Sequence, residues 1–335
     1  MKILVTGGTG FIGSHIVIEL LNSNYEVVVI DNLSNSHNYI HNKIELITNK
    51  KFIFIEGDIR NSDLLSKTFK MYDIFAVIHL AGLKAVGESV KNPLDYYQNN
   101  IAGSIALYSC MRDAQVFNLV FSSSATVYGD PINIPIDENH PVGNVTNPYG
   151  QTKYINELIC RDLVNSNNMW NIGLLRYFNP IGSHPSGLIG ENPKDIPNNL
   201  MPYILQVASS QIDKLLIYGN DWPTKDGTGV RDYIHVLDLA KAHIHCLEKL
   251  RKENIGIKEW NIGTGRGYSV MEILETFERV TKIKIPYEIV SRRVGDIAES
   301  WADSTRSNKD LDWKAQYSID KMVEDSWNWK SKNLN

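Results

Sequence analysis

Three glycines at a fixed spacing stand between the first apolar run of the chain and its first helical pattern. Gly7, Gly10 and Gly13 follow the β-branched run 3–6 and open the amphipathic segment 11–21. Small residues at such a turn let the backbone approach a pyrophosphate, and the helix start adds N–H donors and a positive dipole end. A tight turn alone would also use glycines, but the strand before and the helix after favour a dinucleotide site.

Short apolar runs alternate with helical patterns through the first half of the chain. The runs predict strands at 27–30, 52–55, 74–79, 119–122 and 172–177. Runs that are nearly all apolar suit a parallel sheet covered on both faces. We therefore expect an α/β fold with a doubly wound, mostly parallel sheet of the Rossmann type, which binds its ligand at the carboxyl ends of the strands.

The character of the sequence changes near residue 180, where prolines cluster among glycines and asparagines. Helical patterns return at 269–280, which a Ser-Val-Met-Glu capping box should open, and at 320–330. We expect two domains, with residues 1–180 binding the dinucleotide and residues 181–335 forming a smaller, mixed α/β substrate domain.

Composition narrows the classes of partner and location. The net charge is -4 and long basic runs are absent, so no nucleic-acid partner is expected. Three dispersed cysteines at 110, 160 and 246 argue against a disulfide framework and against a metal site. No run of about 18 apolar residues predicts a membrane span, and the first apolar run is too short for a signal peptide. We expect a cytoplasmic protein.

An acidic residue ends the second predicted strand. Asp31 lies 18 residues after Gly13, where a carboxylate can accept hydrogen bonds from an adenosine ribose and would repel a 2′-phosphate. No Arg or Lys follows at once, so the sequence favours NAD over NADP, although a solvated loop Asp is the alternative. Gly57-Asp58 and Leu80-Ala81-Gly82 follow the next two strands and fall at the same edge of the sheet.

A tyrosine and a lysine stand one helical turn apart after a helix-start signal. Asn147-Pro148 predicts the start, which places Tyr149 and Lys153 on one face. Lowering a phenol pKa from about 10 to about 7 takes roughly 4 kcal/mol. One positive charge at about 6 Å supplies roughly 2.8 kcal/mol at an effective dielectric of 20, so the lysine and a charged nicotinamide ring would have to act together.

The Tyr-x-x-x-Lys pair alone is common by chance and often lies on a surface. The Ser122-Ser123-Ser124 run supports a functional reading, because it follows an apolar strand and so falls at the same sheet edge. A hydroxyl there could hold the substrate oxygen that Tyr149 deprotonates, although a helix-capping role would also suit serine.

These motifs together resemble the extended short-chain dehydrogenase/reductases. Residues 6–13, 79–82, 122–129 and 149–153 carry that resemblance. Segments 31–36, 81–89, 176–180, 196–202 and 226–236 are similar to the UDP-galactose 4-epimerase family in particular. The resemblance runs from end to end of the chain.

The resemblance implies a role for individual residues. It makes Tyr149 the general base, Lys153 the group that lowers its pKa, and Ser124 the partner of the sugar hydroxyl. The implied cofactor contacts, which also include Tyr149 and Lys153, are Gly7, Gly10, Phe11, Ile12, Gly13, Asp31, Asn32, Asn35, Asp58, Ile59, Leu80, Ala81, Gly82, Lys84, Asn99, Ser122 and Phe178. The implied contacts to the UDP-sugar, besides Ser124, are Asn179, Asn199, Leu200, Tyr218, Arg231, Arg293, Asp296 and Ser300.

Some of these positions can be judged on their own chemistry. Arg231 and Arg293 offer the bidentate geometry that a diphosphate needs, although either could form a surface salt bridge. Leu80 departs mildly from the family, because some members carry an aromatic residue there. Ser300 stands where some relatives carry Tyr, and a small residue leaves room for an acetamido group.

The reaction implied by the resemblance is the interconversion of UDP-galactose and UDP-glucose through a transient 4-keto sugar, with tightly bound NAD. Ser300 extends the expectation to UDP-GalNAc and UDP-GlcNAc. A homodimer is also expected by resemblance, through helices that include the one bearing Tyr149.

Four other functions compete. A nucleotide-sugar 4,6-dehydratase places an Asp-Glu pair directly after the Ser/Thr position, and a decarboxylase typically has a Glu there, whereas this chain has Ala125-Thr126. A simple alcohol dehydrogenase would release NADH in stoichiometric amount. A non-catalytic NAD sensor on the same fold would have no need of Ser124, Tyr149 and Lys153 together.

Overall fold

A large parallel sheet forms the centre of the computed structural model, which describes residues 1–194, 199–293 and 295–334. Its order is β10-β6-β5-β4-β1-β2-β3, so the direction of winding reverses between β1 and β4. All its neighbouring strands run parallel, which confirms the expected Rossmann-type α/β fold. The strands are β1 (Lys2–Thr6), β2 (Glu26–Asp31), β3 (Ile53–Glu56), β4 (Ile74–His79), β5 (Asn118–Ser124), β6 (Asn171–Tyr177) and β10 (Ile257–Ile262).

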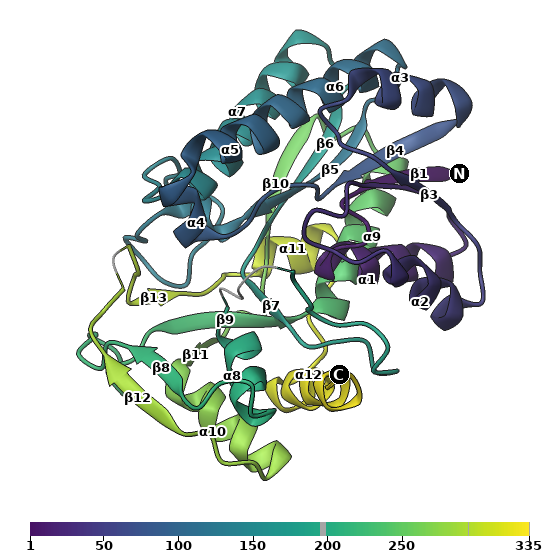
Figure 1. Cartoon of the computed structure of the whole chain (residues 1–335). Helices are drawn as coiled ribbons and strands as arrows, with labels where there is room; N and C mark the ends of the chain where they lie inside the picture. Colours follow the sequence, from purple (N-terminus) through teal and green to yellow (C-terminus); the bar gives the residue numbers. More distant parts are fainter. Residues whose placement is uncertain (195–198, 294, 335) are drawn as a thin grey trace.

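Helices cover both faces of this sheet (Figure 1). One face carries α1 (Phe11–Asn22), α2 (Tyr39–Thr48) and α9 (Val236–Lys252), and the other carries α3 (Ser62–Met71), α6 (Gly103–Asp113) and α7 (Pro148–Ser166). Along β1, Ile3 and Val5 belong to the first apolar cluster and Leu4 to the second. Burial on both faces explains why the strands are apolar throughout rather than alternating.

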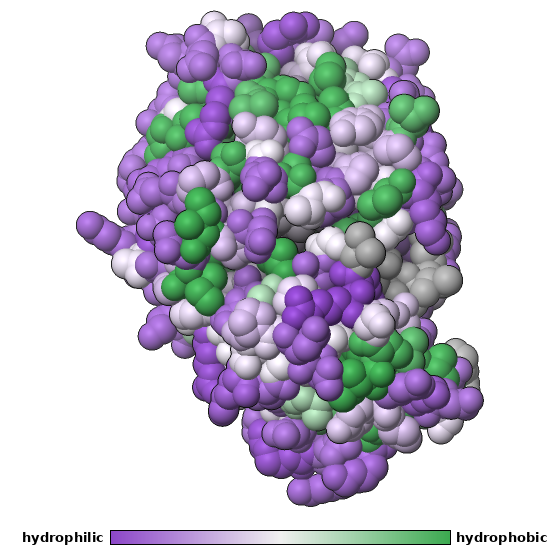
Figure 2. Space-filling view, turned by 90° about the vertical axis from the view of Figure 1, so that its left-hand side faces the viewer, coloured by the Kyte–Doolittle hydropathy of each residue, from purple (hydrophilic) through white to green (hydrophobic). Residues whose placement is uncertain are grey.

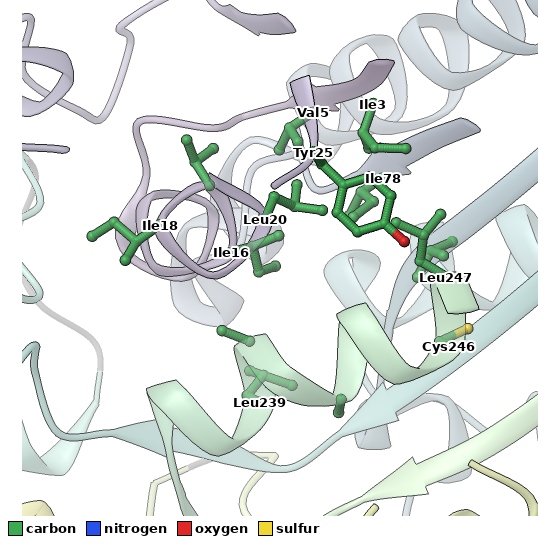
Figure 3. Packing of buried hydrophobic residues seen from close by; sticks show 14 of the residues in the cluster. Ile3, Val5, Ile16, Ile18, Leu20, Tyr25, Ile78, Leu239, Cys246 and Leu247 are labelled. Carbon is green, nitrogen blue, oxygen red and sulfur yellow. The ribbon is translucent and has the colours of Figure 1, made fainter. Parts of the chain in front are cut away.

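The packing between α1, α9 and the sheet is shown in Figure 3, where Ile16 and Leu20 of α1 lie near Leu239 and Leu247 of α9. These contacts join segments more than 200 residues apart in the chain. Since α9 follows the predicted boundary at residue 180, the second half of the sequence helps to close the first apolar core.

A smaller part lies below the large sheet in Figure 1. In it β9 pairs with β11, β13 and β7, while β8 and β12 form a separate parallel pair. The strands are β7 (Asn179–Ile181), β8 (Leu215–Tyr218), β9 (Val230–His235), β11 (Gly267–Ser269), β12 (Tyr287–Val290) and β13 (Glu299–Ser300). Its helices are α8 (Leu200–Ala208), α10 (Val270–Thr281) and α12 (Ile319–Lys332).

Helix α10 begins as the sequence predicts. The Ser269 hydroxyl accepts a hydrogen bond from the Glu272 N–H at 3.0 Å, and Glu272 accepts one from the Ser269 N–H at 2.8 Å. Together with α8 and α12, this helix buries a separate apolar cluster that includes Ile204, Phe277 and Val323. The smaller part therefore has its own core.

Short elements connect these layers. They are α4 (Val86–Lys91), α5 (Pro93–Tyr97), the π-helical turn η1 (Gln98–Ala102), the 3-10 turn η2 (Ala125–Tyr128) and α11 (Thr305–Asp310). Within the described residues, none of the helices combines the length and the apolar character that crossing a membrane would require.

The chain returns to the large sheet after residue 180. Strand β10 pairs with β6 along its whole length, and α9 packs on α1. A division into residues 1–180 and 181–335 therefore omits a strand and a helix from the larger part. The Pro-rich stretch near residue 180 suggested the boundary. No local pattern in the sequence shows that a strand as late as β10 joins the first sheet.

Candidate active site

The glycine loop is fixed by close backbone contacts. Gly7 has a φ of 72°, and a Cβ there would lie 2.8 Å from the Ala81 nitrogen. A Cβ on Gly13 would lie 2.2 Å from the Gly7 oxygen. At Gly10, however, an added Cβ would meet only the Gly7 oxygen at 3.4 Å. The fold thus requires the first and third glycines, and the second leaves the surface over the helix start open.

The start of α1 has the features that bind a diphosphate. Gly10 is its N-cap, so no side chain occupies the N–H groups of the first turn. Those groups, with the helix dipole, form a site for a negative ligand. Phe11 and Ile12 follow in the same turn and are partly buried.

Asp31 lies beside this loop. Its carboxylate accepts hydrogen bonds from the Thr9 N–H at 3.0 Å, the Leu33 N–H at 2.9 Å and the Ser36 hydroxyl at 3.2 Å. Three donors hold it in place while lone pairs remain for a ribose. The strand end and the glycine loop therefore meet, as the spacing predicts.

The segments after β2 and β3 also meet. The Asn32 amide donates to the Asp58 carboxylate at 3.0 Å, and Arg60 donates to the same carboxylate at 2.7 Å. The hydrogen bond to Arg60 lowers the pKa of Asp58, so this group stays ionised. Ile59 is buried and faces Gly103 of α6.

The loop after β4 is anchored by a residue that sequence reasoning missed. The Asn100 amide accepts from the Leu83 N–H at 2.8 Å, donates to the Leu83 carbonyl at 3.0 Å and donates to the Thr152 hydroxyl at 3.0 Å. Asn99, predicted as a cofactor contact, donates to the same amide. The only local signal for this anchor is a run of two asparagines. The π-helical turn that orients their side chains cannot be predicted from the sequence.

Helix α7 starts where the Asn-Pro signal predicts. The Asn147 side chain accepts from the Gly150 N–H at 2.9 Å, and Pro148 is the first helical residue. Tyr149 and Lys153 are both buried, and Lys153 Nζ donates to the Ser122 carbonyl at 2.6 Å. The Nζ atom lies 6.0 Å from the centre of the Tyr149 ring. The structure therefore brings the helix and the β5 edge together.

The pKa values of Tyr149 and Lys153 both depend on their burial. Burial lowers the pKa of Lys153 to about 8. Burial, with the nearby Tyr177, raises the pKa of Tyr149, while a hydrogen bond with Ser124 lowers it. Lys153 by itself therefore does not turn the phenol into a base at neutral pH in the ligand-free protein. Further positive charge is needed at this point.

The serine run has three separate roles. Ser122 pairs with the Tyr177 hydroxyl at 2.7 Å, Ser123 donates to Glu157 at 2.6 Å, and Ser124 faces Tyr149. Ser124 also accepts from the Thr126 N–H at 3.2 Å, so it caps η2 as well. The helix-capping contact of Ser124 is therefore observed, and its role toward the substrate stays a prediction.

A buried ion pair supports this edge from behind. Arg176 and Glu157 are almost inaccessible and form two hydrogen bonds, at 2.9 and 2.6 Å. Arg176 also donates to the Tyr128 hydroxyl at 3.1 Å. The pair ties β6 to α7, Ser123 joins β5 to the same carboxylate, and removing one partner would leave an unpaired buried charge. Arg176 lies in the family-like segment 176–180, but no sequence pattern indicates that Glu157 is its partner.

The predicted sugar-nucleotide contacts come from the smaller part and its junction. Arg293 stacks over the Tyr218 ring at 4.3 Å, and Arg231 lies 3.9 Å from Asp296. Arg231 also donates to the Ile297 carbonyl at 2.9 Å, and Ser300 is its partner in the β13–β9 register. These five residues therefore line one neighbourhood.

The remaining predicted contacts sit at element ends. Asn179 begins β7 directly after Phe178, which is buried, and Asn199 is the N-cap of α8, with Leu200 as its first residue. Residues 196–198 of the family-like segment 196–202, and residue 294 next to Arg293, lie outside the described residues.

Asp232 is a second residue that sequence reasoning missed. It is fully buried, and its carboxylate accepts from the Thr264 N–H at 2.9 Å, the Gly265 N–H at 3.1 Å and the Ala302 N–H at 3.2 Å. Arg231 and Asp232 thus anchor the chain on both sides of Ser300. Burial raises the pKa of Asp232 to about 6.

Comparison with known proteins places this geometry in a family. The protein family described as GDP-mannose 4,6 dehydratase matches residues 4–326. The UDP-glucose 4-epimerase of Bacillus subtilis (strain 168) is 53% identical over 100% of this chain and 98% of its own length. The human UDP-glucose 4-epimerase is 51% identical over 99% of this chain and 97% of its own.

A solved structure agrees. The UDP-glucose 4-epimerase from Bifidobacterium longum, in complex with NAD+ and UDP, has a TM-score of 0.96 and 47% identity, and the match covers 99% of each chain. Both the fold and the sequence are therefore similar from end to end.

Proposed function

We propose which residues carry the reaction from the premise that the chain belongs to the family described as GDP-mannose 4,6 dehydratase. Within that family it belongs to the UDP-glucose 4-epimerases of the extended short-chain dehydrogenase/reductase type. The enzyme is an NAD-dependent isomerase that interconverts UDP-galactose and UDP-glucose. The observation that carries the residue assignment is the meeting of Tyr149, Lys153 and Ser124 at the edge of the sheet beside the glycine loop.

The residues present fit NAD. The open helix start at Gly10 suits a diphosphate, and the three donors on Asp31 leave it able to accept from a ribose. Bound NAD supplies the electron acceptor for C4 of the sugar and a positive charge. Most of the cofactor contacts proposed from the resemblance lie at or just after the carboxyl ends of β1 to β6, whereas Asn99 lies in η1 and Tyr149 and Lys153 lie on α7.

Tyr149 is the proposed general base for the sugar 4-hydroxyl. Burial raises its pKa in the ligand-free protein, so the phenol becomes a competent base only when positive charge is placed beside it. Ser124 positions the same hydroxyl, and Lys153, held by the Ser122 carbonyl, stabilises the phenolate. Proton transfer is thereby linked to occupancy of the cofactor site.

Arg231 and Arg293 are proposed to hold the diphosphate of the sugar nucleotide, and Tyr218 its base. Anchoring the nucleotide leaves the 4-keto sugar free to turn over in the pocket without leaving, because remote contacts provide the binding energy. After the sugar has turned over, Tyr149 would return its proton to the 4-oxygen, and hydride supplied by the bound cofactor would reach the opposite face of C4, which inverts this carbon with no net oxidation.

The competing functions are not favoured. Position 125 is Ala and position 126 Thr, so the acids used by a 4,6-dehydratase are missing next to Ser124. The curated relatives named above are epimerases over their full length. A sensor would not need the buried Lys153–Ser122 contact that orders the base.

We propose that the N-acetylated sugars UDP-GalNAc and UDP-GlcNAc are also substrates. Ser300 pairs with Arg231 in the sheet, and its short side chain leaves space at the sugar end of the site. The test is turnover of UDP-GalNAc by the wild-type protein. Good turnover of UDP-galactose with none of UDP-GalNAc would contradict the proposal.

We propose that the enzyme is a homodimer. Leu94 of α5, Ile105 of α6 and Leu158 of α7 are exposed by 79%, 48% and 42%, which is unusual for apolar residues on neighbouring helices. Figure 2 shows apolar side chains on this face at the height of α5 and α7. Sedimentation should give a dimer for the wild type and a monomer for Leu94→Glu together with Leu158→Glu.

We also propose a cytoplasmic location. All three cysteines are free and buried, which suits a reducing compartment. Fractionation of cells expressing a tagged full chain tests this directly, and recovery in a membrane or exported fraction would contradict it.

The first experiment on the function is incubation of the purified protein with UDP-galactose and no added NAD, followed by chromatography. UDP-glucose is expected, since the cofactor is regenerated in each cycle and stays bound. If product forms only after NAD is added, the enzyme is an epimerase that does not retain its cofactor. Stoichiometric NADH instead of UDP-glucose would identify a simple dehydrogenase.

A further inference from the structure

Residues 191–194, which we call the strap, belong by sequence to the smaller part but contact the cofactor half. The Lys194 N–H donates to Asn35 Oδ1 at 2.8 Å, and Lys194 Nζ donates to the Leu33 carbonyl at 2.7 Å. The Asn192 amide donates to the Tyr39 hydroxyl at 3.0 Å. The strap is thus tied to the loop after β2, directly beyond Asp31.

Glu191 begins the strap and joins two other residues. Its Oε1 accepts from Lys84 Nζ at 2.8 Å and from the Asn199 amide at 3.4 Å. The Glu191 side chain is only 10% exposed, so its ion pair with Lys84 is partly shielded from solvent. One carboxylate therefore contacts a residue assigned to the cofactor and a residue assigned to the sugar nucleotide.

We propose that Glu191 is a positioning residue that couples the two ligand sites, and that the strap slows the escape of the bound dinucleotide. The proposal rests on the assignment of Lys84 to the cofactor and of Asn199 to the UDP-sugar. It concerns neither the base nor the hydroxyl that reacts.

The geometry gives the physical reason. To open the loop after β2, the protein must break the strap contacts at Lys194 and Asn192 as well as any contact to the cofactor. A sugar nucleotide that orders Asn199 also orders Glu191, and through it Lys84. Because coupling between two binding sites is reciprocal in affinity, UDP should tighten dinucleotide binding and the dinucleotide should tighten UDP binding by the same factor. We expect the tighter dinucleotide binding to appear as slower release.

The test measures dinucleotide release, without any sugar turnover. Wild type, Glu191→Gln and Lys194→Met are purified with their bound NAD, and its loss is followed by rapid filtration with and without UDP. The controls are Glu275→Gln on the exposed face of α10 and Lys309→Met on α11, which remove the same charges elsewhere. Far-UV circular dichroism and thermal melts establish that each variant is folded.

We expect release to be about tenfold faster in Glu191→Gln and in Lys194→Met, since each loses a hydrogen bond made by a charged group. UDP should slow release in the wild type, in the controls and in Lys194→Met, whereas Glu191→Gln should lose the effect of UDP. Release at the wild-type rate in Glu191→Gln, or an unchanged effect of UDP, would overturn the proposal.

A second measurement separates positioning from simple structural damage. With saturating NAD, Glu191→Gln should keep kcat for UDP-galactose within about twofold and raise KM, because a positioning residue is not part of the chemistry. An equal fall in kcat and kcat/KM would contradict the assignment. If the wild type retains NAD but produces no UDP-glucose, the proposed function fails while the strap result stands.

Discussion

The two halves of the site are built in different ways. In the cofactor half, most of the proposed residues lie at or just after the carboxyl end of a parallel strand, as Asp31 ends β2 and Leu80 follows β4, so that the sheet brings them together. In the sugar-nucleotide half, residues from separate segments are tied by side chains, as Arg231 is tied to the Ile297 carbonyl and Asp232 to the Ala302 N–H. The first half is specified by local spacing and the second by contacts over long stretches of chain.

This difference has a consequence for mutation. A substitution in the cofactor half should change the chemistry and leave the arrangement intact, whereas one in the other half should move its neighbours. The predictions below test that contrast.

Tyr149→Phe should have the largest effect. Loss of the phenol removes the base, and kcat should fall about 10²- to 10⁴-fold, the usual contribution of general acid–base catalysis. Bound NAD and the thermal midpoint should stay near wild type, because the ring remains in place. The control is Tyr154→Phe on the same helix, which should retain activity. Substantial activity in Tyr149→Phe would remove the tyrosine from the mechanism.

Asp232→Asn should raise KM for the UDP-sugar about 10- to 100-fold. The carboxylate accepts from several donors, and an amide would offer one oxygen and turn two donors toward those N–H groups. Asp312→Asn is the matched control, because Asp312 is exposed and has a positive φ that Asn tolerates. An unchanged KM in Asp232→Asn would break the contrast between the halves.

The same residue predicts a pH dependence. Since the Asp232 pKa is about 6, KM of the wild type should rise as the pH falls through about 6, when the carboxylate gains a proton, and Asp232→Asn should lack this rise. For stability the sign is reversed. The folded pKa lies above the ordinary value of 3.8, so this group stabilises the fold most below about pH 4 and loses that contribution as the pH rises through 6.

Ser300→Tyr should sharpen the comparison within the sugar half. The larger ring would fill the space proposed for an acetamido group, so kcat/KM for UDP-GalNAc should fall at least about tenfold relative to UDP-galactose. Ser300→Ala keeps the space and should not change the ratio. Competition assays with both sugars in one vessel measure it, and equal losses for the two sugars would show general damage instead.

Asn147→Ala should have the smallest effect. It removes the cap that starts α7, which typically costs about 1 kcal/mol of the free energy of unfolding. Urea denaturation measures the change, and Asn308→Ala at an exposed position of α11 is the control. Activity should persist, since the sheet and the helix body still hold Tyr149. A large loss of activity would show that the cofactor half also depends on individual side-chain contacts.

The sequence predicts the cofactor half well for physical reasons. The strands at 74–79 and 172–177 and the α7 start all follow from short-range patterns, and the structure confirms them. The capping box at 269–272 is confirmed for the same reason, although it lies in the smaller part. The NAD preference follows from Asp31 in the same way, and the solved relative with NAD+ agrees.

The rest depends on contacts that no local pattern contains. Glu191 contacts Lys84 across 107 residues, and Asp232 contacts Ala302 across 70. The positive charge beside Leu33 is also unpredictable from nearby residues. The sequence after Asp31 has no Lys or Arg close by, and Lys194 of the strap supplies the charge. The raised pKa of Tyr149 in the ligand-free protein is a further case, since the charge of Lys153 is predictable from sequence but the burial of the phenol is not.

The return of α9 and β10 to the large sheet means that the backbone passes between the two halves repeatedly. It does so between β6 and β7, between β9 and α9, and between β10 and β11, and it returns once more after β13, since Leu311 and Trp313 lie in the first apolar cluster before α12 begins. Two parts that share a single connection can rotate about it, whereas several connections restrict such rotation. The distance between the larger and the smaller part should therefore change little during turnover. The sugar ring must then reorient without a large movement of one part relative to the other.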